Sequence, residues 1–183
     1  MIDAANYSVH DNLRDGTPVI IRAISRGDGD RIRVAFEHLD REAVYTRFFT
    51  YKKSLTDAEL NDLTDVDSDH VVALVVTTGT GDDEALIGGG RYCSEAALCA
   101  SRSAELAFFT DDHYRGRGVA SLILKHLISI ARDQGLLQFD ADVLAQNRGM
   151  LVVFAHSGLA MKQRREGNVI HVALSLKRDT HDH

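Results

Sequence analysis

The segment that most constrains this chain is residues 103–120, SAELAFFTDDHYRGRGVA. It opens with a strand-like pattern over Ala104 to Thr110, crosses a turn with glycines at positions 116 and 118, and enters a helical pattern at Gly118. The first amides of a helix lack carbonyl partners and carry the positive end of the helix dipole. This order therefore predicts a site for a phosphate-bearing cofactor. A plain glycine-rich loop is the alternative that the turn alone leaves open.

A carboxylate interrupts the apolar part of this strand. Glu105 lies between Ala104 and Leu106, ten residues before Arg115. We expect its side chain to be buried, and a buried carboxylate is costly unless it is paired or used. Apolar surroundings also raise the pKa of a carboxyl group toward the range of a general base. Glu105 is therefore a candidate catalytic base, and a structural carboxylate that binds backbone amides in a bulge is the alternative.

Together these features resemble the GNAT superfamily of acyl-CoA N-acyltransferases. The acyl-CoA signature of that family is glutamine or arginine, two residues, glycine, one residue, and glycine or alanine, and Arg115, Gly118 and Ala120 match it. The Ala-Glu-aliphatic-Ala-Phe pattern that begins at Ala104 resembles the branch that acetylates protein lysines, in which the glutamate is the base. The resemblance covers residues 17–176.

The resemblance implies acetyl-CoA as cosubstrate, with Glu105 as general base toward an amine acceptor. The turn would bind the pyrophosphate through Arg115, Gly116, Arg117, Gly118, Val119 and Ala120. Main-chain groups of Phe108, Phe109 and Thr110 would bind the pantetheine arm, as in β-strand addition. Asn147, eleven residues before Gly158, matches an asparagine that the family places near the pantetheine. A simple helix N-cap is the alternative for Asn147.

One position departs from the family pattern. Many members carry a tyrosine seven residues after that asparagine as general acid, whereas this chain has Phe154. Either no acid is needed, because a thiolate with a pKa near 8.5 leaves readily, or Tyr114 or His113 supplies the proton. His156 is expected to be a solvated or core residue.

The hydrophobic pattern predicts one α/β (α+β) domain over residues 1–183, with residues 1–16 as a polar N-terminal arm. Strands are expected over 17–24, 70–78, 84–93, 104–110, 136–144, 160–165 and 169–176, and helices over 30–49 (two, broken near Asp40), 54–63, 118–134 and 146–157. Gly88, Gly89 and Gly90 suggest a bulge or a close backbone approach. The resemblance implies a mixed, mostly antiparallel sheet of six to seven strands, with a splayed parallel central pair and four or five flanking helices.

Composition limits the environment and the partners. The chain has 44% hydrophobic and 26% charged residues and a net charge of −6, with no basic stripe, which argues against nucleic acid as a partner. No apolar run approaches the roughly 20 residues that cross a membrane, and the N-terminus lacks a signal pattern, so we expect a cytoplasmic location. Cys93 and Cys99 are read as free thiols, and no zinc spacing is present, so no metal is expected.

The acceptor and the alternative functions stay open. Asp57, Glu59, Asp62, Asp65, Asp67 and Asp69 form an acidic run that would attract a lysine or a polyamine if it lay near the cleft, although a solvated helix and loop surface is the favoured explanation. A protein lysine is the first expectation and a small amine the second, and dimerisation is left open. A dinucleotide oxidoreductase with Asp140 as its acidic residue fits poorly, because the turn lacks a third glycine. A catalytically idle acyl-CoA sensor is the remaining alternative.

Overall fold

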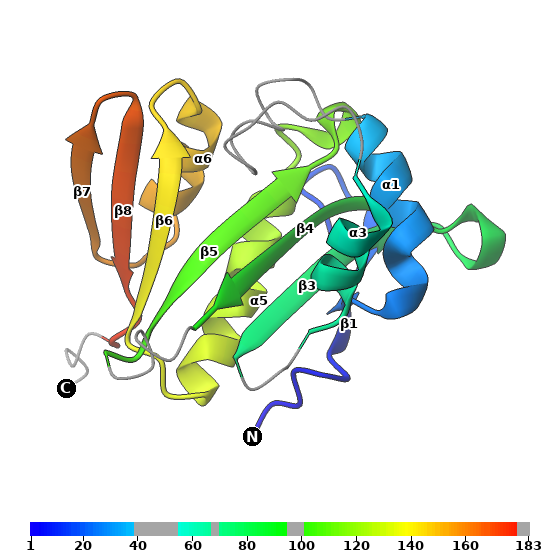
Figure 1. Ribbon diagram of the computed structural model, residues 1–183, viewed down its shortest axis with the longest axis horizontal. Coiled ribbons are helices and arrows are strands. Elements are labelled where there is room, and N and C mark those ends of the chain that lie inside the picture. Colours follow the sequence, from blue (N-terminus) through cyan, green and yellow to red (C-terminus); the bar gives the residue numbers. More distant parts are fainter. Residues whose placement is uncertain (39–54, 67–69, 95–100, 179–183) are drawn as a thin grey trace.

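The computed structural model describes residues 1–38, 55–66, 70–94 and 101–178. One eight-stranded sheet, in the order β1-β2-β3-β4-β5-β6-β8-β7, forms its centre (Figure 1). The strands are β1 (Ser8–Asn12), β2 (Pro18–Ala23), β3 (Val71–Thr78), β4 (Ala85–Cys93), β5 (Ser103–Thr110), β6 (Gln138–Leu144), β7 (Met161–Glu166) and β8 (Val169–Ser175). The α-helices of the described residues are α1 (Gly29–Glu37), α3 (Asp57–Thr64), α5 (Val119–Asp133) and α6 (Arg148–Ala155), with short 3-10 turns η1 (Arg26–Asp28), η2 (Gly81–Asp83) and η3 (Asp112–Tyr114).

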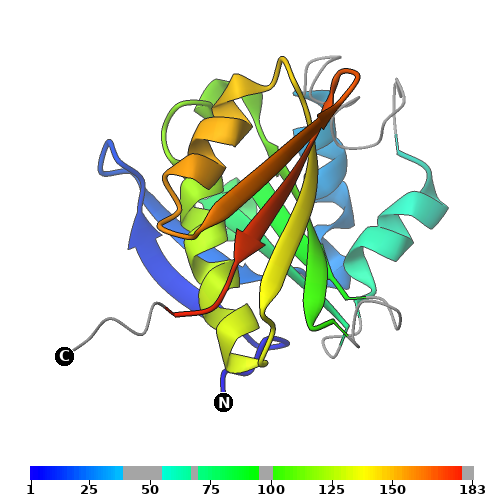
Figure 2. The ribbon, with the colours of Figure 1, turned by 90° about the vertical axis from the view of Figure 1, so that its left-hand side faces the viewer.

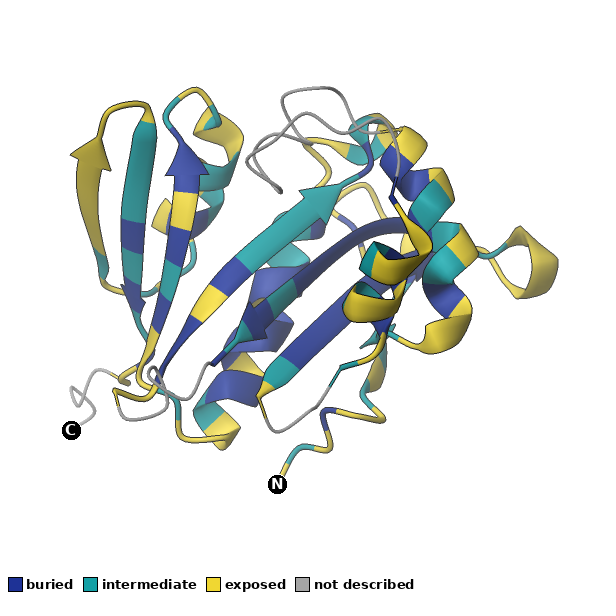
Figure 3. Cartoon of the chain, viewed as in Figure 1, coloured by how far each residue is buried: buried dark blue, intermediate teal, exposed yellow. Residues whose placement is uncertain are grey.

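Helices cover both faces of the sheet. Figure 2 shows α5 and α6 on one side and α1 and α3 on the other. The larger apolar core lies beneath α5, whose buried side chains include Ile123, Leu127 and Ile130. A smaller core around Ile32 and Phe36 lies beneath α1 and α3. Buried and exposed residues alternate along several strands, as expected when each strand face meets a different environment (Figure 3).

The expected mixed sheet with a single parallel pair is confirmed. β5 and β6 run parallel, and every other neighbouring pair is antiparallel. Of the two helices expected within 30–49, the first is α1, and the second lies outside the described residues. The helix expected after residue 54 is α3, which Thr56 caps by accepting a hydrogen bond from the Glu59 amide. No helix in the described ranges is both long and apolar enough to pass through a membrane.

The expectation of a loose N-terminal arm is wrong. Residues 8–12 form β1, which pairs with β2 and adds a strand to the predicted sheet. Leu13 lies in the core with 4% of its surface exposed. The hydroxyl of Tyr7 lies 2.5 Å from Nδ1 of His126, a buried residue of α5. An edge strand that is held by ladder hydrogen bonds and polar contacts shows little apolar alternation, which explains why the sequence pattern missed it.

The glycines of β4 lie at a register shift and at a close backbone approach, the two features that the sequence suggested. The pairing register of β3 and β4 shifts between Val76 and Thr77, opposite Gly88. A Cβ atom on Gly88 would lie 2.6 Å from Cγ1 of Val119, and one on Gly90 would lie 2.6 Å from Cγ2 of Ile123. Helix α5 thus packs against bare backbone. This close approach fixes the position of its N-terminal end over the sheet.

Replacement of Gly90 by alanine should lower the free energy of unfolding by about 1–3 kcal/mol, because the added methyl overpacks the core. A Cβ there would also lie 2.8 Å from Cδ1 of Phe108. Urea denaturation measures the change. The matched control is Gly29→Ala at the start of α1, where φ is −51° and a Cβ would meet no atom within 4 Å. Equal stability of both variants would contradict the close packing of α5.

The parallel pair is short. β5 and β6 are paired only from Ser103 with Gln138 to Glu105 with Asp140. β5 nevertheless continues to Thr110 and β6 to Leu144, and the two strands diverge beyond the paired part (Figure 1). Because the ladder ends early, main-chain groups in the second half of β5 are left without partners on the β6 side.

Candidate functional site

A cleft of about 620 Å³ lies where β5 and β6 diverge. Its walls come from the end of β5, the following turn, the start of α5 and the region of α6. All of the predicted binding residues except Arg117 line it: Phe108, Phe109, Thr110, Arg115, Gly116, Gly118, Val119, Ala120 and Asn147. Segments that are about 40 residues apart in the sequence therefore line one cleft.

The glycine turn presents main-chain donors to this cleft. Gly116 and Gly118 adopt positive φ values of 74° and 87°, which glycine accepts without strain. Gly118 is the N-cap of α5, and the first hydrogen bond to its carbonyl comes from the Leu122 amide at 3.0 Å. The amides of Val119, Ala120 and Ser121 therefore have no carbonyl partner within the helix. Such a helix end favours a bound anion.

The charge of the cleft also favours an anion. Arg14, Arg115 and Arg148 line it, and none of the described lining residues is an aspartate or a glutamate. The sequence analysis missed Arg14, which lies between β1 and β2 in the segment expected to be an arm. The Arg14 amide donates to the Arg117 carbonyl at 3.3 Å, and its side chain packs against Gly118. Only the pairing of β1 with β2 brings it here, so no local sequence signal marks it.

The side chain of Arg117 contacts Tyr114 and Asp15. Its guanidinium carbon lies 5.0 Å from the centroid of the Tyr114 ring, and Nη1 lies 3.5 Å from the Asp15 carboxylate. The Arg117 side chain therefore stabilises the turn through these contacts and does not line the cleft. Tyr114 itself lines the cleft.

Asn147 has a structural role and also reaches the cleft. Its Oδ1 accepts a hydrogen bond from the Met150 amide at 3.2 Å, so it is the N-cap of α6. Asn147 lines the cleft as well, which makes the two predicted roles compatible. Phe154 is buried and packs edge to face on Phe108, with centroids 6.0 Å apart. The side chain that replaces the family's tyrosine therefore belongs to the core, and His156 is exposed at the cleft.

Glu105 is exposed, so the expectation that it would be buried is wrong. Its apolar neighbours Ala104 and Leu106 are buried in the core beneath α5, and strand alternation places Glu105 on the opposite face. It is the last residue of β5 paired with β6, three positions before Phe108 at the cleft. The carboxylate thus stands where the two strands begin to separate, on the α1 and α3 face.

A small apolar cavity of about 50 Å³ lies on the same face as Glu105. Ala107 and Phe109, which share the strand parity of Glu105, line it together with residues of α1. Phe109 lines both this cavity and the larger cleft. The described part of the acidic run, from Asp57 to Asp65, lies on this side too, and Asp57 pairs with Arg33 and Asp65 with Arg26, each at 2.8 Å. Asp67 and Asp69 lie outside the described residues. Part of its negative charge is therefore compensated.

A divergent parallel pair beside a glycine turn that opens a helix is the arrangement expected of an acyl-CoA transferase, and comparison with known proteins makes the class specific. A family model described as the acetyltransferase (GNAT) family matches residues 35–158. The chain belongs to this family, and it is an acetyltransferase by that membership.

Relatives and solved structures agree with this assignment. The chain is 31% identical over 140 residues to "Acetyltransferase PA5475" of Pseudomonas aeruginosa, covering 76% of this chain and 74% of that protein. It is 31% identical to the GNAT domain of S. lividans PAT, with a TM-score of 0.82 over 92% of this chain and 96% of that one. A further curated relative is longer, and the chain spans 42% of its length.

The fold is also that of a protein solved with acetyl-CoA. The structure of yncA, a putative acetyltransferase from Salmonella typhimurium with its cofactor acetyl-CoA, matches with a TM-score of 0.70 at 16% identity. The match covers 88% of this chain and 96% of that one. The GNAT fold expected from the sequence is thus confirmed, as is the resemblance to the bacterial PAT branch.

Proposed function

We propose that the protein transfers an acetyl group from acetyl-CoA directly to a primary amine, with a protein lysine side chain as the first candidate acceptor and a small amine as the second. The observation that carries this proposal is the cleft, which is lined by the start of α5, where three amides lack a carbonyl partner within the helix, and by Arg14, Arg115 and Arg148. No aspartate or glutamate is among the described lining residues, although Nε of Arg115 lies 2.9 Å from the carboxylate of Asp112 beside the cleft. A diphosphate requires such a surface.

The free edge of β5 suits the other part of the cosubstrate. Beyond Glu105, the main chain of Phe108 to Thr110 has no strand partner on the β6 side and can bind the amides of a pantetheine arm. The thioester would then lie near the point of divergence, on the path between the cleft and Glu105. Asn147 lies on the facing wall, and its Oδ1 accepts a hydrogen bond from the Met150 amide. Its side-chain Nδ2 would therefore be the atom that donates to the pantetheine arm.

The reaction needs a neutral amine. A lysine with a pKa near 10.4 is neutral in only about one part in a thousand at pH 7, so a nearby base helps the attack. Glu105 accepts the proton, directly or through water, as the nitrogen forms its bond to the thioester carbon. The carbon–sulfur bond then breaks, and coenzyme A leaves as a thiolate that takes a proton from solvent or from Tyr114.

Two observations support a protein lysine as the acceptor. The similarity to PAT favours a protein lysine, and the exposed position of Glu105 would admit a lysine from a folded protein surface. The test is release of free thiol from acetyl-CoA with lysine peptides, N-terminally blocked peptides and polyamines as acceptors. Coenzyme A binding without release of thiol above background would instead favour the idle sensor.

Arg14→Gln should weaken coenzyme A binding about tenfold or more, because a charge-assisted hydrogen bond contributes about 1.5–3 kcal/mol. Isothermal titration calorimetry measures the Kd, and the effect should shrink as salt is added. The matched control is Arg117→Gln, whose side chain lies against Tyr114 and Asp15 and should leave the Kd within about threefold. A larger loss in the control than in Arg14→Gln would contradict the assignment.

A further inference from the structure

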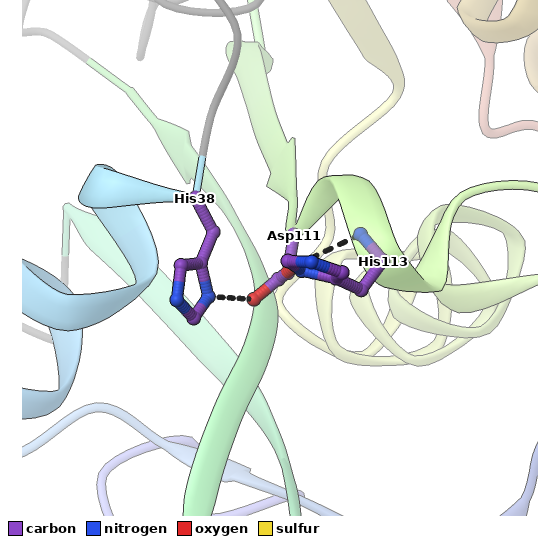
Figure 4. A group of neighbouring side chains, drawn as sticks. All are labelled: His38, Asp111 and His113. Carbon is purple, nitrogen blue, oxygen red and sulfur yellow. Dashed lines mark hydrogen bonds and ion pairs between the residues drawn. The ribbon is translucent and has the colours of Figure 1, made fainter.

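Two histidines and one aspartate converge, and the proposed reaction does not require them as a group (Figure 4). They lie next to the cleft, because Asp111 and His113 stand between Thr110 and Tyr114, which line it. His38 follows α1, Asp111 follows β5, and His113 lies in η3. Nδ1 of His38 lies 2.6 Å from Oδ2 of Asp111, and Nδ1 of His113 lies 2.9 Å from Oδ1. One donor atom from each residue lies within 4.8 Å of the others.

The carboxylate is fixed and the two rings are accessible. The Asp111 amide donates to the Ile87 carbonyl, its carbonyl accepts from the Tyr114 amide, and Oδ1 also accepts from the His113 amide, each at 2.9 Å. Asp111 is 4% exposed, whereas both histidines are exposed. The rings stand nearly perpendicular, with an interplanar angle of 83° and centroids 5.1 Å apart. Small ring rotations can therefore adjust both nitrogens toward a shared point.

The electrostatics of the cluster favour a cation. In the part of the chain that the structure describes, the partners of the Asp111 carboxylate are the two imidazoles and one amide, with no lysine or arginine among them. Burial of a carboxylate is costly without a compensating charge, and a neutral imidazole brings none. A divalent ion bound by all three groups would place a positive charge beside the buried carboxylate.

We propose that His38, Asp111 and His113 form a zinc site. Zinc binds histidine nitrogens and carboxylate oxygens at about 2.0–2.2 Å, commonly through three protein ligands with water in the fourth position. Donors around a tetrahedral zinc lie about 3.4 Å apart, so the present nitrogen–oxygen separations need to widen slightly. Two imidazoles and a carboxylate are a poor set for magnesium, which prefers oxygen ligands. The sequence analysis expected no metal because no second cluster of cysteine or histidine accompanies Cys93 and Cys99 at zinc spacing.

The ion would connect distant parts of the fold. His38 and Asp111 are 73 residues apart, and the turn after Asp111 leads directly to the amides at the start of α5. A zinc ion would therefore fix the end of α1 to the turn that precedes the cleft. Its expected effect is on the stability of this arrangement, and acetyl transfer would still proceed through Glu105.

The experiment measures zinc binding to the full chain after treatment with EDTA and dialysis. Competition with a chromophoric chelator should give one zinc per chain, and the zinc should raise the melting temperature. His38→Ala combined with His113→Ala should lose this binding and the thermal shift, and Asp111→Asn should weaken binding about tenfold or more. Magnesium should produce no shift.

Two controls exclude other histidines. The chain also carries His181 and His183, so the alanine variant of both should bind zinc as the unchanged chain does. His171, which contacts Asp142 and Glu166, provides the second control through His171→Ala. Absence of saturable zinc binding, or retention of one zinc per chain in the His38 and His113 double variant, would overturn the proposal. Because His38 and His113 are exposed, a melting curve in EDTA checks that the double variant is folded.

Discussion

Replacing Glu105 with glutamine should lower kcat/KM for amine acetylation about 10²–10⁴-fold, the range typical of a lost general base. The side chain keeps its size and its exposed position at the divergence of β5 and β6, so the Kd for coenzyme A should stay within about twofold. Steady-state kinetics with the best acceptor and calorimetry with coenzyme A separate the two effects. Activity near wild type in Glu105→Gln would exclude this residue as the base.

The neighbouring strand offers a matched control. Asp140 of β6 is directly in register with Glu105, and its Oδ1 accepts a hydrogen bond from Gln138 at 2.8 Å. Asp140→Asn should retain at least about a third of the activity, because the carboxylate is already engaged on its own strand. A larger loss in Asp140→Asn than in Glu105→Gln would assign the proton transfer to the other strand.

Asp28→Asn should lower the free energy of unfolding by about 3 kcal/mol or more, as expected when one partner of a buried ion pair is removed. Asp28 is fully buried, and its carboxylate accepts from both terminal nitrogens of Arg22 at 2.8 and 2.6 Å. The Ser25 amide donates to it at 2.8 Å. For a chain of this size the melting temperature should fall by about 6–12 °C. Differential scanning calorimetry measures it.

The Asp28 carboxylate also makes the stability of the fold depend on pH. Burial raises the pKa of Asp28, but its hydrogen bonds with Arg22 and Ser25 outweigh burial and hold the pKa below its usual range. A lowered pKa in the folded state stabilises the protein above the unfolded-state value of about 3.9, and this contribution is lost as the pH falls through the folded-state pKa. Below pH 4, the free energy of unfolding of Asp28→Asn should therefore vary less with pH than that of the unchanged chain. The exposed pair partner Asp65 provides the control, since Asp65→Asn should change stability by about 0.5 kcal/mol or less.

The elements that the sequence predicted well have local signals. The strand from Ser103, the turn at Gly116 and Gly118, and helix α5 are contiguous, so the cleft could be predicted from one segment. Asn147 was predictable because a cap residue at the start of a helix is also a local pattern. The antiparallel pairs β3–β4, β4–β5 and β7–β8 followed from short connections between strands.

The features that the sequence analysis missed depend on long-range pairing. Arg14 reaches the cleft only because β1 joins the sheet, and the cluster of His38 with Asp111 joins residues 73 positions apart. The burial of Glu105 was predicted wrongly because the apolar residues beside it in the sequence point to the other face of the strand. The tertiary fold decides which face of a strand a helix covers, so the neighbours of a residue in the sequence do not show whether that residue is buried.

The short β5–β6 ladder divides the sheet into two half-sheets, β1 to β5 and β6 to β8, that share only three paired positions. A molecule of coenzyme A in the cleft would touch the end of β5 on one half and the α6 region on the other. Ligand binding would therefore act as a second junction across this seam. Amide hydrogen exchange at residues 103–105 and 138–140 would slow when the cleft is filled, and it would report occupancy independently of any acetyl transfer.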